Sequence, residues 1–438
     1  MADLSINFAG IRSPNPFWLA SGPPTNTAYQ VHRAFEAGWG GIVWKTIGEP
    51  IVNVSSRYSA MHLGHMRMVG FNNIELISDR SIESNFREIA EVKKAWPERA
   101  VIASFMTDSR ENWHDLVKRG EDAGVDGFEL NFGCPHGMCE RGMGSAVGQN
   151  PDVAEKITSW VMEVASRPVI VKLTPNITNI LHAARAAKRG GANAISLINT
   201  ISSITQVDLD RFVPEPFVDG ASTHGGYCGP AVKPIALNMV QSCAQDMELG
   251  LPISGIGGIS TWRDAAEFIA LGAGSIQVCT AVMHHGFRIV EDMVDGLTAY
   301  LDGNGMKSVA KLTGRAVPSL QRWENLNLNY QRVARINYDQ CIGCNLCHIA
   351  CEDGAHQCID LVNPESSGIG YGSGRMKGKA VPKVREEDCV GCNLCSLVCP
   401  VDGCISMIEM PSDRDPMSWS EYSSLLAEGK IAPIPPHK

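Results

Sequence analysis

The sequence predicts an α/β protein in two parts, a (β/α)8 barrel (TIM barrel) followed by a small domain that holds metal clusters. Eight short apolar runs alternate with helix-patterned stretches over the first 300 of the 438 residues. About 250 residues or more is the usual size of such a barrel. Ten of the 15 cysteines lie between Cys341 and Cys404. In a chain without secretory features, so dense a group indicates metal more often than disulfides.

Composition and charge exclude several other classes of protein. The net charge of −9 argues against nucleic acid as the main partner. The opening "MADLSINFAG" lacks a basic segment followed by an apolar one, so no secretory signal is expected. No run of 18 apolar residues occurs, so no membrane span is expected either. We therefore expect a cytoplasmic protein.

The eight strand candidates are almost continuously apolar, as parallel strands buried on both faces are. A doubly wound open sheet is the competing architecture. No G-x-G-x-x-G opens a helix early in the chain, so the dinucleotide-binding fingerprint is missing. Thr261 is predicted to cap a helix, with Asp264 three residues on. The expected strands span residues 17–21, 41–46, 101–106, 127–131, 169–174, 194–200, 252–257 and 275–280.

Polar residues follow the expected strands at their C-terminal ends, where barrels carry their chemistry. Lys45 and Lys172 end otherwise apolar runs, and a lysine in a barrel mouth needs an anionic or electron-rich partner. The run "GIGGIS" and the end of strand eight predict a phosphate site, with a tight glycine turn as the alternative. The strand-end candidates are Ser21, Lys45, Thr46, Asn131, Lys172, Asn199, Thr200, Gly257, Gly258, Cys279 and Thr280.

The expected domains are the barrel at 1–305, a helical connector at 306–335, a cluster domain at 336–408 and a C-terminal tail at 409–438. Two long loops, about 47–80 and 202–231, follow the second and sixth strands. Long loops on the catalytic face are usually lids or specificity elements.

The C-terminal cysteines repeat one spacing, C-x2-C-x2-C-x3-C, twice. This is the bacterial ferredoxin pattern, in which three close thiolates hold one [4Fe–4S] cube and the fourth reaches the other cube. Zinc also uses C-x2-C pairs, but the doubled spacing favours clusters. Glu352 stands where the first motif would carry Pro, and no role is assigned to Cys358 or Cys404. The expected ligands are Cys341, Cys344, Cys347 and Cys399 for cluster one, and Cys389, Cys392, Cys395 and Cys351 for cluster two.

Two cubes pass one electron at a time, so two-electron chemistry at the barrel needs a converter, for which a flavin is usual. The phosphate of FMN suits the glycine site, and a lysine suits the flavin edge where negative charge develops.

The glycine-rich stretch 131–151 follows strand four and holds Cys134. A thiol of ordinary pKa, about 8.5, is protonated at neutral pH and can serve as an acid. His136 and Cys139 are rivals, and the residues alone favour Cys134 over His136 only slightly.

The segments "LNFGCPHGMCERGMGSAVGQ", "NIELIS", "KLTPNIT", "INT" and "ISGIGGI", followed by the doubled cysteine motif, resemble the dihydropyrimidine dehydrogenase family. The resemblance covers that enzyme's dihydroorotate-dehydrogenase-like barrel and C-terminal iron–sulfur domain, up to about residue 408. It implies reduction of uracil or thymine to the 5,6-dihydropyrimidine, the first step of reductive pyrimidine degradation. Hydride would pass from FMN to C6 and a proton from Cys134 to C5. Electrons would come from NAD(P)H through an FAD-carrying partner flavoprotein, in a heterotetramer, and through both clusters.

The resemblance also assigns residues to each ligand. Asparagine amides can pair with the lactam edges of a pyrimidine. Gly133 departs from the family, in which Ser often precedes the catalytic Cys. A dihydroorotate dehydrogenase is the rival enzyme, although no clear Arg follows a strand to bind a carboxylate, and an electron-transfer subunit is the rival of another class. The implied pyrimidine residues are Asn73, Asn131, Asn199 and Thr200. The implied FMN residues are Ser21, Lys45, Thr46, Lys172, Gly229, Ile256, Gly257, Gly258, Cys279 and Thr280.

Overall fold

The computed structural model describes all residues except 50–51, 136–141, 370–379, 413 and 434–438. The chain forms two compact units, Met1–Ser319 and Leu320–Lys438. Within the described residues, no helix combines the length and the apolar character needed to cross a bilayer.

The first unit is a closed barrel of eight parallel strands, which confirms the predicted TIM barrel and excludes the open sheet. Every strand overlaps a predicted one. Several end two or three residues before the predicted end, so that polar residues such as Lys45, Asn199 and Thr280 lie just beyond the strands. Neighbours around the barrel follow the order β10-β17-β18-β3-β4-β7-β8-β9. The strands are β3 (Phe17–Leu19), β4 (Gly41–Val43), β7 (Ala100–Phe105), β8 (Gly127–Asn131), β9 (Val169–Lys172), β10 (Ala194–Leu197), β17 (Ile253–Ile256) and β18 (Ala273–Val278).

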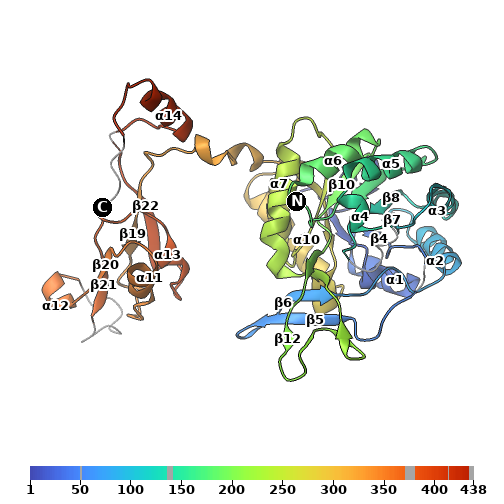
Figure 1. The fold of residues 1–438 in the computed structure, drawn as a ribbon, viewed down its shortest axis with the longest axis horizontal. Helices are drawn as coiled ribbons and strands as arrows, with labels where there is room; N and C mark the ends of the chain where they lie inside the picture. The colour runs from blue at the N-terminus through green and yellow to red at the C-terminus, as the bar shows by residue number, and fades with distance from the viewer. Residues whose placement is uncertain (50–51, 136–141, 370–379, 413, 434–438) are drawn as a thin grey trace. The chain divides into compact units, whose positions relative to one another are not determined.

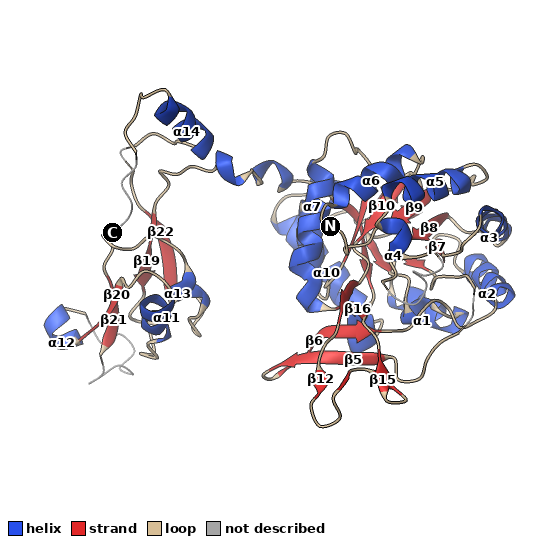
Figure 2. Ribbon diagram, in the orientation of Figure 1, coloured by secondary structure: helices blue, strands red, loops and turns tan. Residues whose placement is uncertain are grey.

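Helices surround the barrel in Figures 1 and 2. Most long helices begin at a side-chain cap. Thr261 and Asp264 form the predicted capping box of α8. The long helices are α1 (Ala28–Ala37), α2 (Ile82–Ala95), α3 (Arg110–Asp122), α5 (Pro151–Met162), α6 (Ile180–Arg189), α7 (Lys233–Gln245), α8 (Trp262–Ala270) and α10 (Ile289–Gly303). Short ones are α4 (Ser145–Gly148) and α9 (Thr280–His285).

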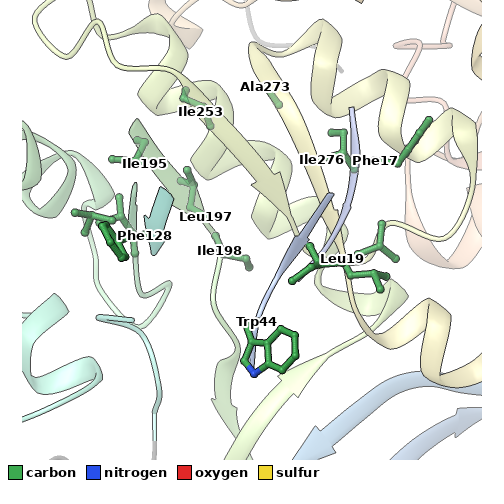
Figure 3. Packing of buried hydrophobic residues seen from close by; sticks show 14 of the residues in the cluster. Phe17, Leu19, Trp44, Phe128, Ile195, Leu197, Ile198, Ile253, Ala273 and Ile276 are labelled. Carbon is green, nitrogen blue, oxygen red and sulfur yellow. The ribbon is translucent and has the colours of Figure 1, made fainter. Parts of the chain in front are cut away.

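One large apolar cluster fills the space between strands and helices. Figure 3 shows some of its members, with Ile195, Leu197 and Ile253 on the adjacent strands β10 and β17. A smaller cluster includes Trp18, Val43 and Ile170 from barrel strands. The hairpin of β1 (Ile6–Phe8) and β2 (Ile11–Ser13) joins that cluster through Phe8 and Ile11. This hairpin was not predicted.

The two segments expected to be long loops instead pair as strands. The antiparallel sheet β11-β16-β6-β5 lies at one end of the barrel unit in Figure 2. We call it the lid sheet; it is formed by β5 (Tyr58–Leu63), β6 (Met66–Asn73), β11 (Ile201–Ser203) and β16 (Gly225–Cys228). Two small hairpins lie between β11 and β16, made by β12 (Val207–Asp208) with β13 (Val213–Pro214) and β14 (Phe217–Val218) with β15 (Ala221–Ser222).

The first part of the expected connector packs on the barrel. Val309 and Leu312 belong to the large apolar cluster, and the Ala316 N–H donates to the Ala270 carbonyl at the end of α8. The compact unit therefore extends to Ser319. Its last elements are the 3-10 turns η4 (Val309–Lys311) and η5 (Val317–Ser319).

The second unit contains two antiparallel strand pairs. β19 (Arg332–Ile336) pairs with β22 (Ile405–Glu409), and β20 (Ile359–Val362) pairs with β21 (Val381–Val384). Helix α11 (Leu346–Gly354) and the short α13 (Leu394–Leu397) each carry motif cysteines. The expected tail contains α14 (Trp419–Ala427), whose capping box is made by Ser418 and Glu421. The remaining elements are α12 (Pro364–Ser367) and the 3-10 turn η6 (Trp323–Asn325).

Candidate active site

A pocket opens where the C-terminal ends of the barrel strands meet the lid sheet. It contains about 1090 Å³ of non-atom space, open solvent included, which is room for a large cofactor together with a small substrate. All fifteen residues assigned above to FMN, pyrimidine or acid catalysis line it. Their individual roles remain predictions.

Lys45 follows β4 and reaches a carboxylate that was not predicted. Its Nζ lies 2.6 Å from Oε1 of Glu75, which also accepts from Nη1 of Arg57 at 2.8 Å. The second Glu75 oxygen accepts from the Tyr58 hydroxyl, and burial together with this carboxylate raises the pKa of Tyr58. Glu75 therefore links Lys45, just after β4, to Arg57 and Tyr58 at the start of the β5–β6 hairpin in the lid sheet.

Lys172 ends β9 and is also paired with a buried carboxylate. Its Nζ lies 3.5 Å from Oε1 of Glu129, on the neighbouring strand β8. Oε2 of Glu129 accepts from Ser196 Oγ at 2.8 Å and from Gln277 Nε2 at 3.1 Å. The Glu129 side chain is 0% exposed. Ion pairing and these hydrogen bonds offset the cost of burying the charge.

The asparagines form a chain across the strand ends. Nδ2 of Asn199 donates to Oδ1 of Asn131 at 2.9 Å, and Nδ2 of Asn131 donates to Thr46 Oγ1 at 3.0 Å. Oδ1 of Asn199 accepts from the Thr200 N–H. On the lid sheet, Oδ1 of Asn73 accepts from the Glu75 N–H at 2.6 Å. Each amide can donate two N–H groups, so these contacts leave donors for a ligand carbonyl.

Gly133 permits the close approach of Asn199. A Cβ on Gly133 would lie 2.4 Å from Cβ and 2.5 Å from Nδ2 of Asn199, distances that real Cβ atoms do not tolerate. A serine at this position therefore requires Asn199 or the loop to move. Replacing the family's usual Ser changes the packing of a predicted substrate residue as well as removing a hydroxyl.

Cys134 lies on the loop after β8 and is 9% exposed. It packs in a small apolar cluster with Ile77, Met106 and Met143. Its carbonyl accepts from the Ser145 N–H at the start of α4, which anchors the loop. His136 and Cys139, the rival acids, lie outside the described residues.

The lid and the Cys134 loop are in contact. His224, just before β16, lies with Nε2 3.2 Å from the carbonyl oxygen of Pro135. Pro135, the residue after Cys134, is therefore in contact with the segment that leads into strand β16 of the lid sheet.

The predicted phosphate site has the backbone freedom that such a site needs. Gly258 has φ +73°, and a Cβ there would lie 2.8 Å from the Lys233 N–H nitrogen and 3.0 Å from the Gly229 carbonyl oxygen. Only glycine fits. Lys233 lies 2.5 Å from Asp264 and 2.7 Å from Glu267, so its ammonium is neutralised by α8. An anion there would then be bound mainly by backbone N–H groups, as is usual at glycine-rich phosphate loops.

Two thiols face the same part of the pocket. Burial raises the pKa of Cys279 to about 12 and that of Cys228 to about 11. Thr280 Oγ1 donates to Cys228 Sγ at 3.2 Å. Both thiols are therefore neutral at physiological pH and form an apolar part of the pocket wall.

These features fit a flavin mononucleotide. The glycine cradle suits its phosphate, and Lys172, which lines the same pocket, supplies a cation for an electron-rich ring edge. Oε1 of Gln277 is buried and has no hydrogen-bond partner among the described residues. A ring N–H would satisfy it, and Gln277 lines the pocket.

The cysteine-rich unit has two separate cavities. One is lined by Cys341, Cys344, Cys347 and Cys399. The other is lined by Cys351, Cys389, Cys392 and Cys395. These are the two predicted ligand sets, including the exchange of the fourth cysteine between motifs.

Single-ion sites are not preformed in this unit. Among the described residues, no three His, Cys, Asp or Glu side chains are close enough to hold one metal ion. Sulfurs spread around a cavity suit a cube better than a tetrahedral zinc ion. The surplus Cys358 and Cys404 also line these cavities, one in each.

Sequence reasoning missed Glu129, Glu75 and Gln277. Glu129 precedes Asn131 by two residues on β8, so the two share a face. Because Glu129 is a carboxylate inside an otherwise apolar strand, the sequence did indicate a buried polar or cationic partner for it. Glu75 lies inside "NIELIS", a segment used for the resemblance without a role for its charge.

Two family models match the chain. Dihydroorotate dehydrogenase matches residues 3–301, and 4Fe-4S dicluster domain matches residues 334–407. Their boundaries lie within the two compact units of the structure.

Three curated proteins illustrate the relationship. The chain is 44% identical over 360 residues to "NAD-dependent dihydropyrimidine dehydrogenase subunit PreA" of Escherichia coli K12, covering 82% of this chain and 87% of that protein. It is 40% identical to "Dihydropyrimidine dehydrogenase (NADP(+)), chloroplastic" of Arabidopsis thaliana, over 72% and 77%. It is 35% identical to "Dihydroorotate dehydrogenase B (NAD(+)), catalytic subunit" of Pyrococcus abyssi, over 72% and 99%.

The barrel, its strand-end pocket and the two cysteine-lined cavities agree with these matches. The chain belongs to the dihydroorotate dehydrogenase family of oxidoreductases, together with dihydropyrimidine dehydrogenases, and carries a 4Fe-4S dicluster domain at its C-terminal side.

Proposed function

We propose that this chain is the pyrimidine-reducing subunit of a dihydropyrimidine dehydrogenase, which saturates the C5=C6 bond of uracil or thymine. The observation that carries the proposal is the convergence of Asn73, Asn131, Asn199 and Cys134 on one pocket with both strand-end lysines. Names of the related E. coli and A. thaliana proteins support the same reaction.

The asparagines bind and orient the ring. The N–H groups left on Asn131 and Asn199 are donors for the ring carbonyls, and Oδ1 of Asn199 can accept from a ring N–H beside the Thr200 N–H. Their mutual hydrogen bond fixes both side chains before substrate enters. Such preorganisation reduces the entropy cost of positioning the ring.

FMN, held by the residues assigned above, would supply the hydride for C6. Lys172 would stabilise negative charge that develops on the flavin, because a cation already fixed in a low-dielectric site needs no reorganisation. Glu129 and Ser196 keep the lysine in place.

Cys134 gives its thiol proton to C5, and solvent restores that proton afterwards. One hydride and one proton then balance the saturation of one double bond. The apolar cluster around the thiol limits the access of water, and the contact between His224 and Pro135 connects the lid to this loop. General acid catalysis of this kind contributes typically 10²–10⁴-fold.

The eight motif cysteines would hold two [4Fe–4S] clusters, which would supply electrons to the barrel. The source is a partner flavoprotein that carries FAD and oxidises NAD(P)H, in a heterotetramer. Two facts support a partner: the dinucleotide fingerprint is absent from this sequence, and the related E. coli protein is named a subunit.

A substrate screen tests the proposal. The full chain is reconstituted without air with FMN, iron and sulfide, and dithionite supplies electrons. Uracil, thymine and orotate are offered separately, and the 5,6-saturated products are quantified by chromatography. We expect uracil or thymine to be reduced and orotate to be left.

Turnover of orotate alone would instead assign the chain as a dihydroorotate dehydrogenase, the activity in the name of the P. abyssi relative. The pocket argues against this outcome. Its described lining contains no arginine or histidine, and each lysine already faces a glutamate. Among the described lining residues, a substrate carboxylate would therefore find no cation beyond Lys45, which is paired with Glu75, and Lys172, which is assigned to the flavin. Loss of all three activities would identify an electron-transfer subunit.

A further inference from the structure

Each cluster cavity contains a fifth cysteine beyond the four expected ligands. Cys358 lies in the cavity of cluster two and Cys404 in that of cluster one. Both are buried, and each directly precedes a strand, β20 and β22 respectively. Each follows the fourth cysteine of its motif, Cys358 by seven residues and Cys404 by five.

Cys358 contacts a predicted ligand. Its Sγ lies 3.5 Å from Sγ of Cys351, and its backbone N–H donates to the same sulfur at 3.4 Å. Once Cys351 is a thiolate bound to iron it has no proton, so only the Cys358 thiol can be the donor in this S···S pair. One residue thus offers two donors to one ligand sulfur.

Cys404 makes its own contacts in the other cavity. It lies against two expected ligands of cluster one, Cys341 and Cys399, and its thiol also lies 3.6 Å from the carbonyl oxygen of Asn337. Because Cys404 lies in the cavity of cluster one, it is a matched control for an effect on cluster two.

We propose that Cys358 is a tuning residue that raises the reduction potential of cluster two by donating a thiol hydrogen bond to Cys351. Reduction adds one electron to the cube and spreads negative charge onto its sulfurs. A donor to a ligand sulfur stabilises that reduced state more than the oxidised one. The thiol keeps its proton throughout, so no other reactant takes part. The inference rests on the cluster ligation in the proposed function.

The experiment is an anaerobic redox titration, followed by electron paramagnetic resonance, of the full reconstituted chain as wild type, Cys358→Ala, Cys358→Ser and Cys404→Ala. Iron and sulfide are quantified first. We expect all four proteins to hold two cubes. Cys358→Ala should shift one midpoint to more negative potential, and the other should stay.

The expected shift corresponds to about a three- to tenfold change in the one-electron equilibrium, the usual net effect of one hydrogen bond; tenfold is about 59 mV. Cys358→Ser should recover part of the shift because a hydroxyl also donates. Cys404→Ala should leave in place the midpoint that Cys358→Ala shifts, because Cys404 lies in the cavity of cluster one.

Three results would overturn the inference: unchanged midpoints in Cys358→Ala, an equal shift of the same midpoint in Cys404→Ala, or loss of one cluster from Cys358→Ala, which would make Cys358 a ligand. A wild-type protein that holds no cubes would contradict the proposed function itself, and iron analysis distinguishes that failure from the others.

Discussion

The side-chain amide of Asn199 donates to Oδ1 of Asn131 over 2.9 Å, with Gly133 lying against Asn199. The two asparagines come from different strand ends, β10 and β8, so the barrel brings them together. Their contact depends on the absence of a side chain at Gly133.

Gly133→Ser should raise KM for uracil about three- to tenfold, because its Cβ displaces Asn199 and weakens one hydrogen bond. Gly133→Ala is the matched control: it adds the same Cβ without a hydroxyl, and steady-state kinetics should show a similar rise. Unchanged KM in both variants would mean that the loop adjusts freely. A rise confined to the alanine variant would instead show that the serine hydroxyl replaces the lost contact.

Glu129→Gln should lower the free energy of unfolding by about 3–5 kcal/mol, because it leaves the Lys172 ammonium buried without a counter-charge. Urea unfolding of the two proteins measures the difference. Glu163→Gln, which breaks the exposed pair with Arg110, should cost no more than about 1 kcal/mol. Equal effects of the two changes would contradict the role given to Glu129.

The thermal midpoint should fall as pH rises from about 9. Unfolded thiols ionise near their ordinary pKa of about 8.5, while burial raises the pKa of Cys228 to about 11 and that of Cys279 to about 12. In that window the unfolded chain binds fewer protons, so stability decreases with pH. Circular dichroism melts should show a shallower decline for the Cys228→Ala, Cys279→Ala double variant. An identical decline would place the titrating groups elsewhere.

Cys344→Ala should stop NAD(P)H-driven reduction of the barrel flavin in the complex with its partner, since one of the two cubes loses a predicted ligand. Stopped-flow absorbance of the flavin measures this. Dithionite should still reduce the flavin directly in the variant, which separates a broken electron path from a damaged barrel. Flavin reduction at the wild-type rate would exclude the clusters from the path.

The barrel was predictable because strands buried on both faces are continuously apolar, and such runs are visible in a single sequence. The lid sheet was not. Its strands β5 and β6 expose side chains such as Met61, Leu63 and Met66, so they lack the burial pattern of a strand. Strand β6 also pairs with β16, more than 150 residues later in the chain. Local sequence patterns cannot indicate a pairing over that distance.

The sequence predicted those site residues that lie at the C-terminal ends of the barrel strands. Lys45 and Lys172 stand out as cations after apolar runs, but their carboxylate partners depend on three-dimensional packing. Glu75 reaches Lys45 from the lid, and Glu129 reaches Lys172 from the next strand. The spacing of the motif cysteines, by contrast, itself predicts which four share a cluster. Each cavity is lined by one of these two predicted sets of four.

The most direct test of the central claim is a single-turnover measurement. Flavin in the reconstituted chain is reduced with one equivalent of dithionite and mixed with uracil, and its reoxidation is followed for wild type and Cys134→Ala. We predict equal flavin content and equal initial reduction, with reoxidation by uracil about 10²–10⁴-fold slower in the variant. Reoxidation at the wild-type rate in Cys134→Ala would show that another group supplies the proton to C5.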